Sequence, residues 1–320
     1  MKRPSTERIT SLKATVLRVE TVRRIVQFVS FLLFNAVIFG VNPAPILLPV
    51  LYSLGTPFKA VGEAFGALQL MLHEQVAPWL ALASLVLIPV LVGRSLCGWI
   101  CPFGFIQDLL SYLKRRHVHI PPQTHGWLVK VKYLVLAVVL LISGTLGISL
   151  ALGVGRIYEQ GLGEFAPAPF TVLSPSETLF AILPRIIVDT YHLILTDLFG
   201  FAPGVYQPAV LEALSSPLLW IRLTIMALVI LLALYVPRGW CRYICPQGAL
   251  SAVISRFSFL GLRRDLVRCT KVGCRACVEA CPMGVRILDL PWEKFNDPEC
   301  IYCLRCVDAC PTKAIRPKFP

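Results

Sequence analysis

Apolar residues along the chain gather into runs that are long enough to cross a membrane. A bilayer core requires roughly 20 apolar residues in a helix. Four segments approach that length: Ile25–Val41, Pro78–Leu96, Tyr133–Leu152 and Pro217–Val236. The pattern predicts a mostly α-helical fold in which residues 25–262 form a four-helix transmembrane bundle of two hairpins.

A further apolar stretch, Leu179–Phe201, differs from these four because polar residues interrupt it. They recur at intervals that place them on one face of a helix: Arg185, Asp189, His192 and Thr196. An amphipathic helix of this kind lies in the membrane interface. A fifth crossing would also place the two ends of the chain on opposite sides, against the distribution of basic residues.

Basic residues orient the predicted helices. Lys and Arg are frequent in the N-terminal segment 1–24 and in the second connection, which carries Lys114, Arg115, Arg116, Lys130 and Lys132. The other two connections hold few: Lys59 in one, Arg156 and Arg185 in the other. Positively charged flanks stay on the cytoplasmic side. We therefore expect a multi-pass protein of the cell (inner) membrane with both termini in the cytoplasm.

The composition indicates that most of the chain lies in a lipid bilayer. Hydrophobic residues make up 56% of it and charged residues 15%, against about 25% charged residues in typical soluble proteins. The net charge of +13 does not indicate nucleic-acid binding, because the Lys and Arg residues flank apolar runs instead of alternating with exposed aromatic residues.

Residues 269–320 hold eight of the twelve cysteines, in two tandem runs. The runs read Cys269-x4-Cys274-x2-Cys277-x3-Cys281-Pro282 and Cys300-x2-Cys303-x2-Cys306-x3-Cys310-Pro311. In two-cluster ferredoxins the cysteine before the proline binds the cluster of the other run. The sequence predicts one [4Fe-4S] cluster on Cys269, Cys274, Cys277 and Cys310, and a second on Cys300, Cys303, Cys306 and Cys281.

Structural zinc is the alternative for these cysteines, since it also accepts four thiolates in short pairs. Two tandem runs that each end in Cys-Pro favour iron–sulfur clusters. Residues 263–320 are therefore expected to form a small α+β ferredoxin domain of the bacterial type. The two extra residues before Cys274 loosen one loop, so the first cluster is expected to be more exposed or to differ in potential.

The other four cysteines belong to an internal repeat. The segment Cys97-Gly-Trp-Ile-Cys101-Pro102-Phe-Gly104 recurs as Cys241-Arg-Tyr-Ile-Cys245-Pro246-Gln-Gly248. Pro102 and Pro246 suit the first position of a helix, which makes Cys101 and Cys245 candidate N-caps with lowered thiol pKa. The four thiols can bind a metal or a third cluster, relay redox state, or pack as small hydrophobic groups.

Other cofactors find no support in the sequence. The histidines lie outside the four predicted spans, where a transmembrane haem would need its ligands: His73, His117, His119, His125 and His192. No Gly-x-Gly-x-x-Gly loop and no Walker motif occurs. No haem, NAD or ATP is expected.

The duplicated motif and the tail together resemble the NapH/MauN-type membrane ferredoxins, which are related to the membrane regions of NosR and CcoG. The resemblance rests on Arg94-Ser-Leu-Cys97-Gly-Trp-Ile-Cys101-Pro102, on Trp240-Cys241-Arg-Tyr-Ile-Cys245-Pro246, and on the eight tail cysteines. It implies electron transfer between membrane quinone and a partner redox protein, with the ferredoxin domain in the cytoplasm.

Three functions remain open from the sequence. The first is an electron-transfer subunit of a quinone-linked oxidoreductase complex, in which other redox subunits carry the catalytic step and no catalytic residue belongs to this chain. The second is a free-standing reductase of copper of the CcoG type. The third is a redox-sensing scaffold.

Overall fold

The structure is a computed structural model that describes residues 6–35, 46–54, 61–114, 118, 120–199, 215–269 and 273–319, with side chains except at 6–18 and 192–199. Some features discussed above lie outside these residues or side chains: the end of the first apolar run, Lys59, Arg115, Arg116, His117, His119, His192, Thr196 and Phe201.

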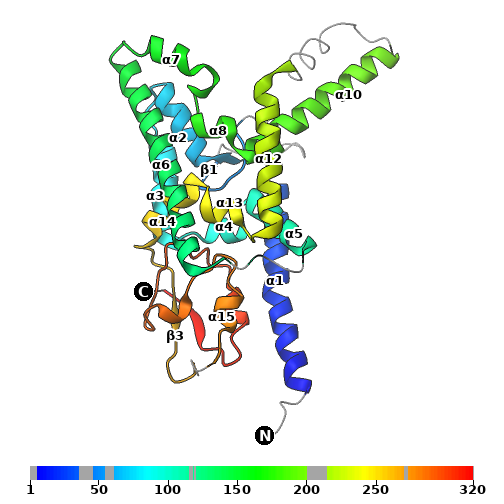
Figure 1. Cartoon of the computed structure of the whole chain (residues 1–320), viewed down its shortest axis with the longest axis vertical. Helices are drawn as coiled ribbons and strands as arrows, with labels where there is room; N and C mark the ends of the chain where they lie inside the picture. The colour runs from blue at the N-terminus through cyan, green and yellow to red at the C-terminus, as the bar shows by residue number, and fades with distance from the viewer. Residues whose placement is uncertain are drawn as a thin grey trace.

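Long helices form the membrane part of the molecule (Figure 1). These are α1 (Thr6–Phe34), α2 (Ala64–His73), α3 (Trp79–Val92), α6 (Pro122–Ala151) and α12 (Pro217–Tyr235). Among the described residues, α6 and α12 are long and apolar enough to cross a membrane. The chain is therefore a mostly helical membrane protein. Two of the expected spans fall on these helices, and the complete four-helix bundle stays a prediction.

The expected span Pro78–Leu96 is wrong at its C-terminal end. Helix α3 has 14 residues and stops at Val92, which gives a length of about 21 Å at 1.5 Å per residue. Gly93 ends it with a φ of +60°, and a Cβ there would collide with the ring of Tyr302. The positive φ of Gly93 ends the helix, and the missing side chain lets the ring of Tyr302 approach the backbone there.

A bent helical segment follows α6. It contains α7 (Arg156–Leu162), η2 (Gly163–Phe165), α8 (Pro169–Leu173), α9 (Pro175–Glu177), η3 (Thr178–Ile182) and α10 (Leu183–Phe199). Residues 156–173 and 175–191 meet at an angle of 84° and have the composition of a broken span or a re-entrant loop. The amphipathic interface helix predicted for this region remains a prediction.

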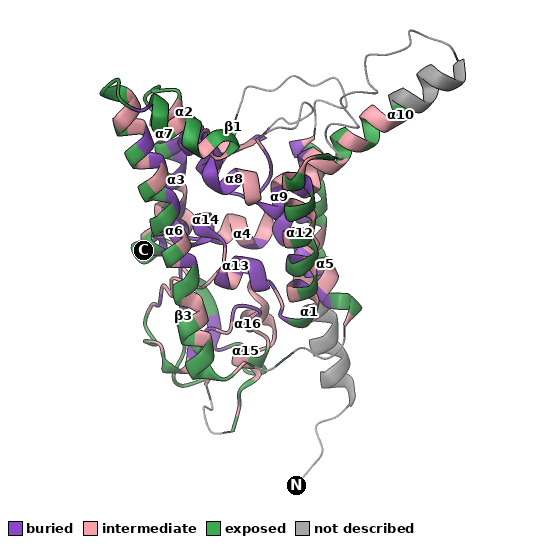
Figure 2. Cartoon of the chain, turned by 45° about the horizontal axis from the view of Figure 1, so that its top comes forward, coloured by how far each residue is buried: buried purple, intermediate pink, exposed green. Residues whose placement is uncertain are grey.

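The two repeats fold alike and exchange their packing partners. The first forms α4 (Ser95–Trp99) and α5 (Pro102–Leu113), and the second forms α13 (Gly239–Tyr243) and α14 (Pro246–Ser255). Helix α5 packs against α12 of the second half as well as α1, and α14 packs against α3 of the first half as well as α6. Figure 2 shows that α13 and α14 are largely buried in the centre of the molecule.

The tail forms a small α+β domain with its own hydrophobic core. Strand β3 (Gly261–Arg264) pairs antiparallel with β4 (Ile315–Lys318), and the register runs from Gly261 opposite Lys318 to Arg264 opposite Ile315. Between the strands lie α15 (Ala276–Glu279), η4 (Ile287–Asp289) and α16 (Arg305–Asp308). A second sheet, in the membrane part, pairs β1 (Ile46–Leu48) in parallel with β2 (Val61–Glu63).

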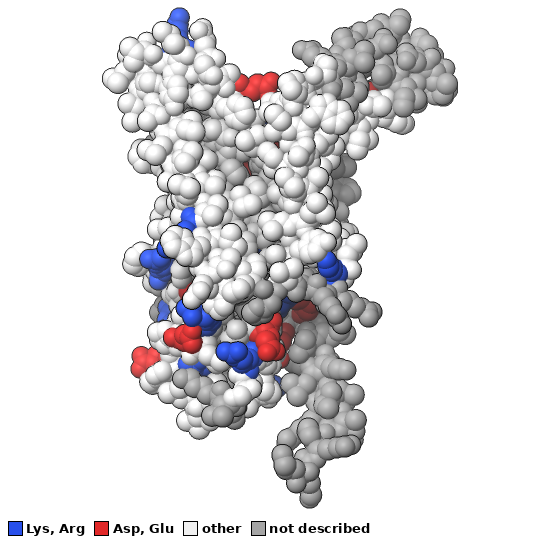
Figure 3. All heavy atoms as spheres, viewed as in Figure 1, with Lys and Arg blue, Asp and Glu red and all other residues white. Residues whose placement is uncertain are grey.

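The tail domain and the beginning of α1 lie at the same end of the molecule, opposite α7 (Figure 1). In the view of Figure 3, most charged residues gather over that end, and the surface of the helical part is nearly free of them. Glu20 of α1 contacts Arg305 of the tail at 2.8 Å. The side of the membrane on which each terminus lies stays a prediction.

Candidate iron–sulfur sites

The eight tail cysteines line two separate cavities. The wall of the first contains Cys269, Cys274, Cys277 and Cys310, together with Arg264, Leu288 and Ile315. The wall of the second contains Cys281, Cys300, Cys303 and Cys306, together with Leu262, Met283 and Phe295. The structure therefore brings together the two sets of four cysteines that the spacing predicts, including the exchange of the cysteine before each proline.

Backbone geometry aims the sulfurs into the cavities. Tyr302 and Leu304, on either side of Cys303, have φ angles of 48° and 60°, which non-glycine residues seldom adopt outside functional loops. These left-handed turns fold the loop between Cys300 and Cys306 around the second cavity. The short helix α16 then begins at Arg305.

In each cysteine run, a backbone N–H group donates a hydrogen bond to the cysteine that lines the cavity of the other run. Val285 N donates to Cys281 Sγ at 3.4 Å, and Ala314 N donates to Cys310 Sγ at 3.3 Å. Such bonds stabilise a thiolate and are among the factors that set the potential of an iron–sulfur cluster. Four sulfurs, N–H donors and otherwise mainly apolar walls fit a [4Fe-4S] cluster in each cavity.

The two cavities differ in their environment. Burial raises the pKa of Cys281 to about 11 and raises that of Cys300 well above its ordinary value. Burial also acts on Cys310, but hydrogen bonds from Thr312 and Ala314 lower its pKa below the ordinary value. The second cavity is thus the drier one, and the exposed residues Pro311 and Thr312 line the first. The difference has the direction that the looser first run predicts.

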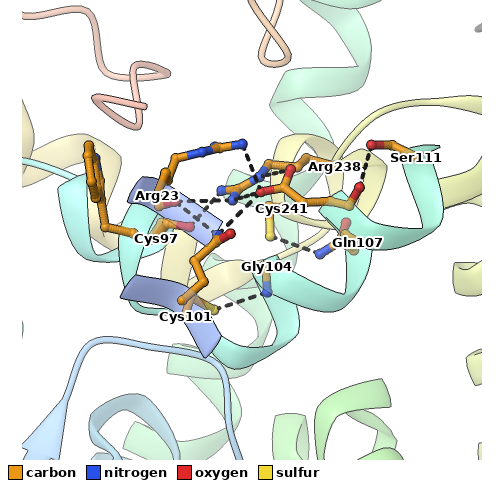
Figure 4. Close-up of polar contacts among 12 residues, drawn as sticks. Arg23, Cys97, Cys101, Gly104, Gln107, Ser111, Arg238 and Cys241 are labelled. Atoms are coloured by element: carbon orange, nitrogen blue, oxygen red, sulfur yellow. Dashed lines mark hydrogen bonds and ion pairs between the residues drawn. The ribbon is translucent and has the colours of Figure 1, made fainter. Parts of the chain in front are cut away.

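In the motifs, Cys101 and Cys245 are the N-caps of α5 and α14, as predicted. The Sγ of Cys101 accepts a hydrogen bond from Gly104 N at 3.4 Å, and the Sγ of Cys245 accepts one from Gly248 N at 3.1 Å. Figure 4 shows the first of these caps and, beside it, Gln107, which donates to Cys241 Sγ at 3.1 Å. Sulfurs of both repeats are therefore hydrogen-bond acceptors.

The expected lowering of the thiol pKa at these N-caps is wrong. Burial raises the pKa of Cys101, and the neighbouring thiols of Cys241 and Cys97 raise it further, so that the N–H of Gly104 does not compensate. Burial likewise raises the pKa of Cys245 well above the ordinary value. Without a bound metal, these cysteines are neutral thiols at neutral pH.

The four motif cysteines come from the two halves of the chain and meet. Each of Cys101, Cys241 and Cys245 is at most 4% exposed and belongs to the core of the membrane part. Cys97 packs against the core of the tail domain. The thiols of Cys241 and Cys97 act to raise the pKa of Cys101, and those of Cys241, Cys97 and Cys101 act to raise the pKa of Cys245. Among the described residues, no group of three or more His, Cys, Asp or Glu side chains is placed to hold a single metal ion, so a centre at the four motif cysteines stays a prediction.

The first motif touches the loop of the second cavity. Trp99 Nε1 donates to the carbonyl oxygen of Tyr302 at 2.9 Å. A Cβ on Gly98 would collide with the carbonyl oxygen of Ile301, so only glycine allows this approach. The first motif is thus in direct contact with the second cavity, whereas the wall of the first cavity contains the exposed residues Pro311 and Thr312.

Buried charges surround the motifs and were not predicted from the sequence. The carboxylate of Asp108 in α5 accepts a hydrogen bond from Nε of Arg238 at 2.9 Å. It also lies within 3.4 Å of the guanidinium groups of Arg23 and Arg24 in α1. Burial acts to raise the pKa of Asp108, but the arginines hold it well below its usual range. Extending the repeat by three residues toward the N-terminus would have found Arg94 and Arg238, which occupy equivalent positions.

Comparisons with known families match both regions. The family described as a 4Fe-4S binding domain matches residues 76–121 and 218–265, so that each match contains one Cys-x3-Cys-Pro motif. The family described as a 4Fe-4S dicluster domain matches residues 268–315, which contain the eight tail cysteines.

Several curated proteins are similar over most of this chain. An uncharacterized protein of Methanocaldococcus jannaschii is 25% identical over 236 residues, which are 72% of this chain and 66% of that protein. The putative electron transport protein YccM of Escherichia coli is 25% identical over 73% of this chain and 54% of its own length. The ferredoxin-type protein NapH of Escherichia coli is 26% identical over 76% and 69%, respectively.

The chain thus spans about half to two thirds of the length of these relatives. No solved structure matches it.

Proposed function

Because this chain belongs with the NapH-type membrane ferredoxins, we propose that it carries single electrons between the membrane and a redox partner through the two tail sites. The observation that carries the proposal is the contact between the first motif and the loop of the second cavity, where Trp99 bonds to Tyr302. It connects the membrane part to a drier site and, beyond it, to a more exposed one.

The residues of the tail would hold two [4Fe-4S] clusters, which supply one-electron redox chemistry when bound. Cys269, Cys274, Cys277 and Cys310 would hold the first, and Cys281, Cys300, Cys303 and Cys306 the second. The apolar wall of the second cavity excludes water, while the first opens toward Pro311 and Thr312 at the surface. A soluble partner would therefore exchange electrons at the first cavity.

The four motif cysteines would hold a third centre at the membrane end of this path. Two observations support it: the thiols converge from both halves of the chain, and each motif lies within a match to a 4Fe-4S binding domain. Membrane quinol is the proposed source or acceptor of electrons there, and other redox subunits would complete the reaction.

Topology follows from the same proposal. Both termini and the tail would be cytoplasmic, since the start of α1 and the tail share one end of the molecule. Reporters fused after the C-terminus and inserted near Gly126 should both read as cytoplasmic, and one near Pro167 as external. Opposite sides for the first two would refute the proposed topology.

The alternative as a copper reductase is disfavoured by burial. Cys101, Cys241 and Cys245 are at most 4% exposed, and only Cys97 of the four is half-buried, so a free copper ion could approach one thiol but not the set of four. The same burial suits a centre that only exchanges electrons.

Iron and acid-labile sulfide analysis of the purified protein tests the proposal. Two tail clusters give about eight iron atoms per chain, and a third cluster at the motifs gives about twelve. Stoichiometric zinc with iron near zero would overturn the electron-transfer function. Reduction of the clusters by a quinol in membranes would then test the electron source.

A further inference from the structure

Each repeat places a buried arginine three residues before its first cysteine. Arg94 is the N-cap residue of α4, and Arg238 is the N-cap residue of α13. The two residues are 1% and 0% exposed. A buried guanidinium is costly unless carbonyl or anionic groups surround it. Two such residues at equivalent positions therefore indicate a role in the motif site.

Each arginine reaches into the opposite repeat. Nη1 of Arg238 donates to the carbonyl oxygen of Cys97 at 2.6 Å, and Nη2 of Arg94 donates to that of Cys241 at 3.4 Å. A Cβ on Gly248 would lie 2.9 Å from Nη2 of Arg94 and 3.4 Å from the Sγ of Cys245. The guanidinium of Arg94 therefore lies beside the helix N-terminus that carries the fourth cysteine.

The two arginines differ in how completely their donors are used. All three nitrogens of Arg238 donate, to the carboxylate of Asp108 and to the carbonyls of Cys97 and Gly98. Arg94 donates through Nη1 to Pro298 and Glu299 and through Nη2 to Cys241. Its Nε is buried and has no hydrogen-bond partner in the part of the chain that the structure describes.

The neighbours of Arg94 show where that donor is useful. Besides the carboxylate of Glu299, they are the carbonyl oxygen of Cys241 and, across the Cβ position of Gly248, the Sγ of Cys245. Hydrogen bonds to sulfur and positive charge nearby both favour the more negative, reduced state of a metal–thiolate centre, which raises its potential. Glu299 also pairs with Lys132, so it keeps a cation when Arg94 is removed.

We propose that Arg94 tunes the centre held by the four motif cysteines: its Nε–H donates to a sulfur there, and its charge raises the reduction potential. Arg238 has a structural role instead: its hydrogen bonds hold the two repeats together. The inference rests on the proposed function, because it requires a centre at these cysteines.

The test compares Arg94→Gln and Arg94→Lys with Arg238→Gln in the full-length protein. Arg222→Gln is the control, since it removes a half-buried arginine that bonds to Val172 far from the motifs. Iron and sulfide are measured first. A redox titration then follows the motif centre, identified as the signal that is absent from Cys101→Ser.

We expect both Arg94 variants to retain wild-type iron. In Arg94→Gln the equilibrium constant for reduction of the motif centre should fall about tenfold, which is 59 mV for one electron, and Arg94→Lys should show a smaller fall. Arg238→Gln should lose iron from the motif site. Arg222→Gln should match the wild type in iron and in potential.

Two results would overturn the inference and leave the electron-transfer function intact. One is a wild-type potential in both Arg94 variants. The other is loss of motif iron in both, which would give Arg94 the same structural role as Arg238. A wild-type protein with about eight iron atoms, and no signal lost in Cys101→Ser, would instead disprove the third centre itself.

Discussion

The tail and the motifs both gather four cysteines at a site, and they do so by opposite routes. In the tail, each cavity takes three cysteines from one run and a fourth from the other run. In the motifs, one pair comes from each half of the chain, and helix N-caps and exchanged arginines hold the pairs together. The tail site is local, and the motif site exists only in the folded chain.

The two regions also handle charge differently. The tail directs backbone N–H groups at its sulfurs and opens one cavity toward the surface. The motif site lies in the membrane part, with full side-chain charges buried beside it: Arg94, Arg238 and Asp108. A redox partner can therefore bind at the edge of the tail domain. The motif site is shielded from solvent, so electrons would reach it through the neighbouring tail cavities.

The largest expected effect comes from cutting the path between the two regions. Cys300→Ser removes a sulfur from the second cavity and should abolish reduction of the first cluster by quinol. Cys274→Ser, its matched control in the first cavity, should leave the second cluster reducible. Stopped-flow spectroscopy with a quinol analogue measures both. Normal reduction of the first cluster in Cys300→Ser would show that the second cavity is not on the path.

Removal of a motif thiol should have the next largest effect. Cys245→Ser is nearly isosteric, so the fold and the tail iron should survive, while reduction of the tail clusters by quinol should become slow or cease. Iron analysis and quinol-driven reduction are compared in one preparation. Unchanged rates in both Cys245→Ser and Cys101→Ser would mean that these thiols only pack.

The contact between the regions should be sensitive to one methyl group. Gly98→Ala places a Cβ against the carbonyl oxygen of Ile301, and overpacking of this kind costs about 1–3 kcal/mol. We expect the cluster absorbance of the tail to be lost at a lower temperature. Gly144→Ala in α6 is the control because nothing lies within 4 Å of its added Cβ. Equal melting of the two variants would contradict the close approach.

The smallest effect is expected at the contact of α1 with the tail. Burial acts to raise the pKa of Glu20, but hydrogen bonding and charge from Arg305 hold it well below its usual range. The stabilisation is therefore complete at neutral pH, begins to fall below the unfolded-state pKa of about 4.3, and is lost as the pH falls through the lowered folded-state pKa. Glu20→Gln should cost about 1 kcal/mol at pH 7 and make hydrogen exchange in α16 faster. An effect that stays equal at pH 7 and about 1.5 pH units below the unfolded-state pKa would contradict this assignment.

The sequence was most informative where chemistry depends on local spacing. The run of cysteines predicted both cavities, and the prolines after Cys101 and Cys245 predicted the N-caps. The early end of α3 had a local signal, Gly93, which the apolar run obscured, whereas the packing of Tyr302 against that glycine was not predictable because Tyr302 is distant in sequence. The prediction of a lowered thiol pKa at the motifs was also wrong, because burial in a core formed by both halves of the chain outweighs the effect of a single N–H hydrogen bond.

The exchange of packing partners between the repeats has a consequence for biosynthesis. Helix α5 needs α12, and α14 needs α3, so the first half of the protein enters the membrane without the surface against which it will close. At 5–20 residues per second, the ribosome needs on the order of ten seconds to deliver the second motif after the first. A centre shared by the two pairs of thiols, as proposed above, would therefore be assembled only after the second motif has been made.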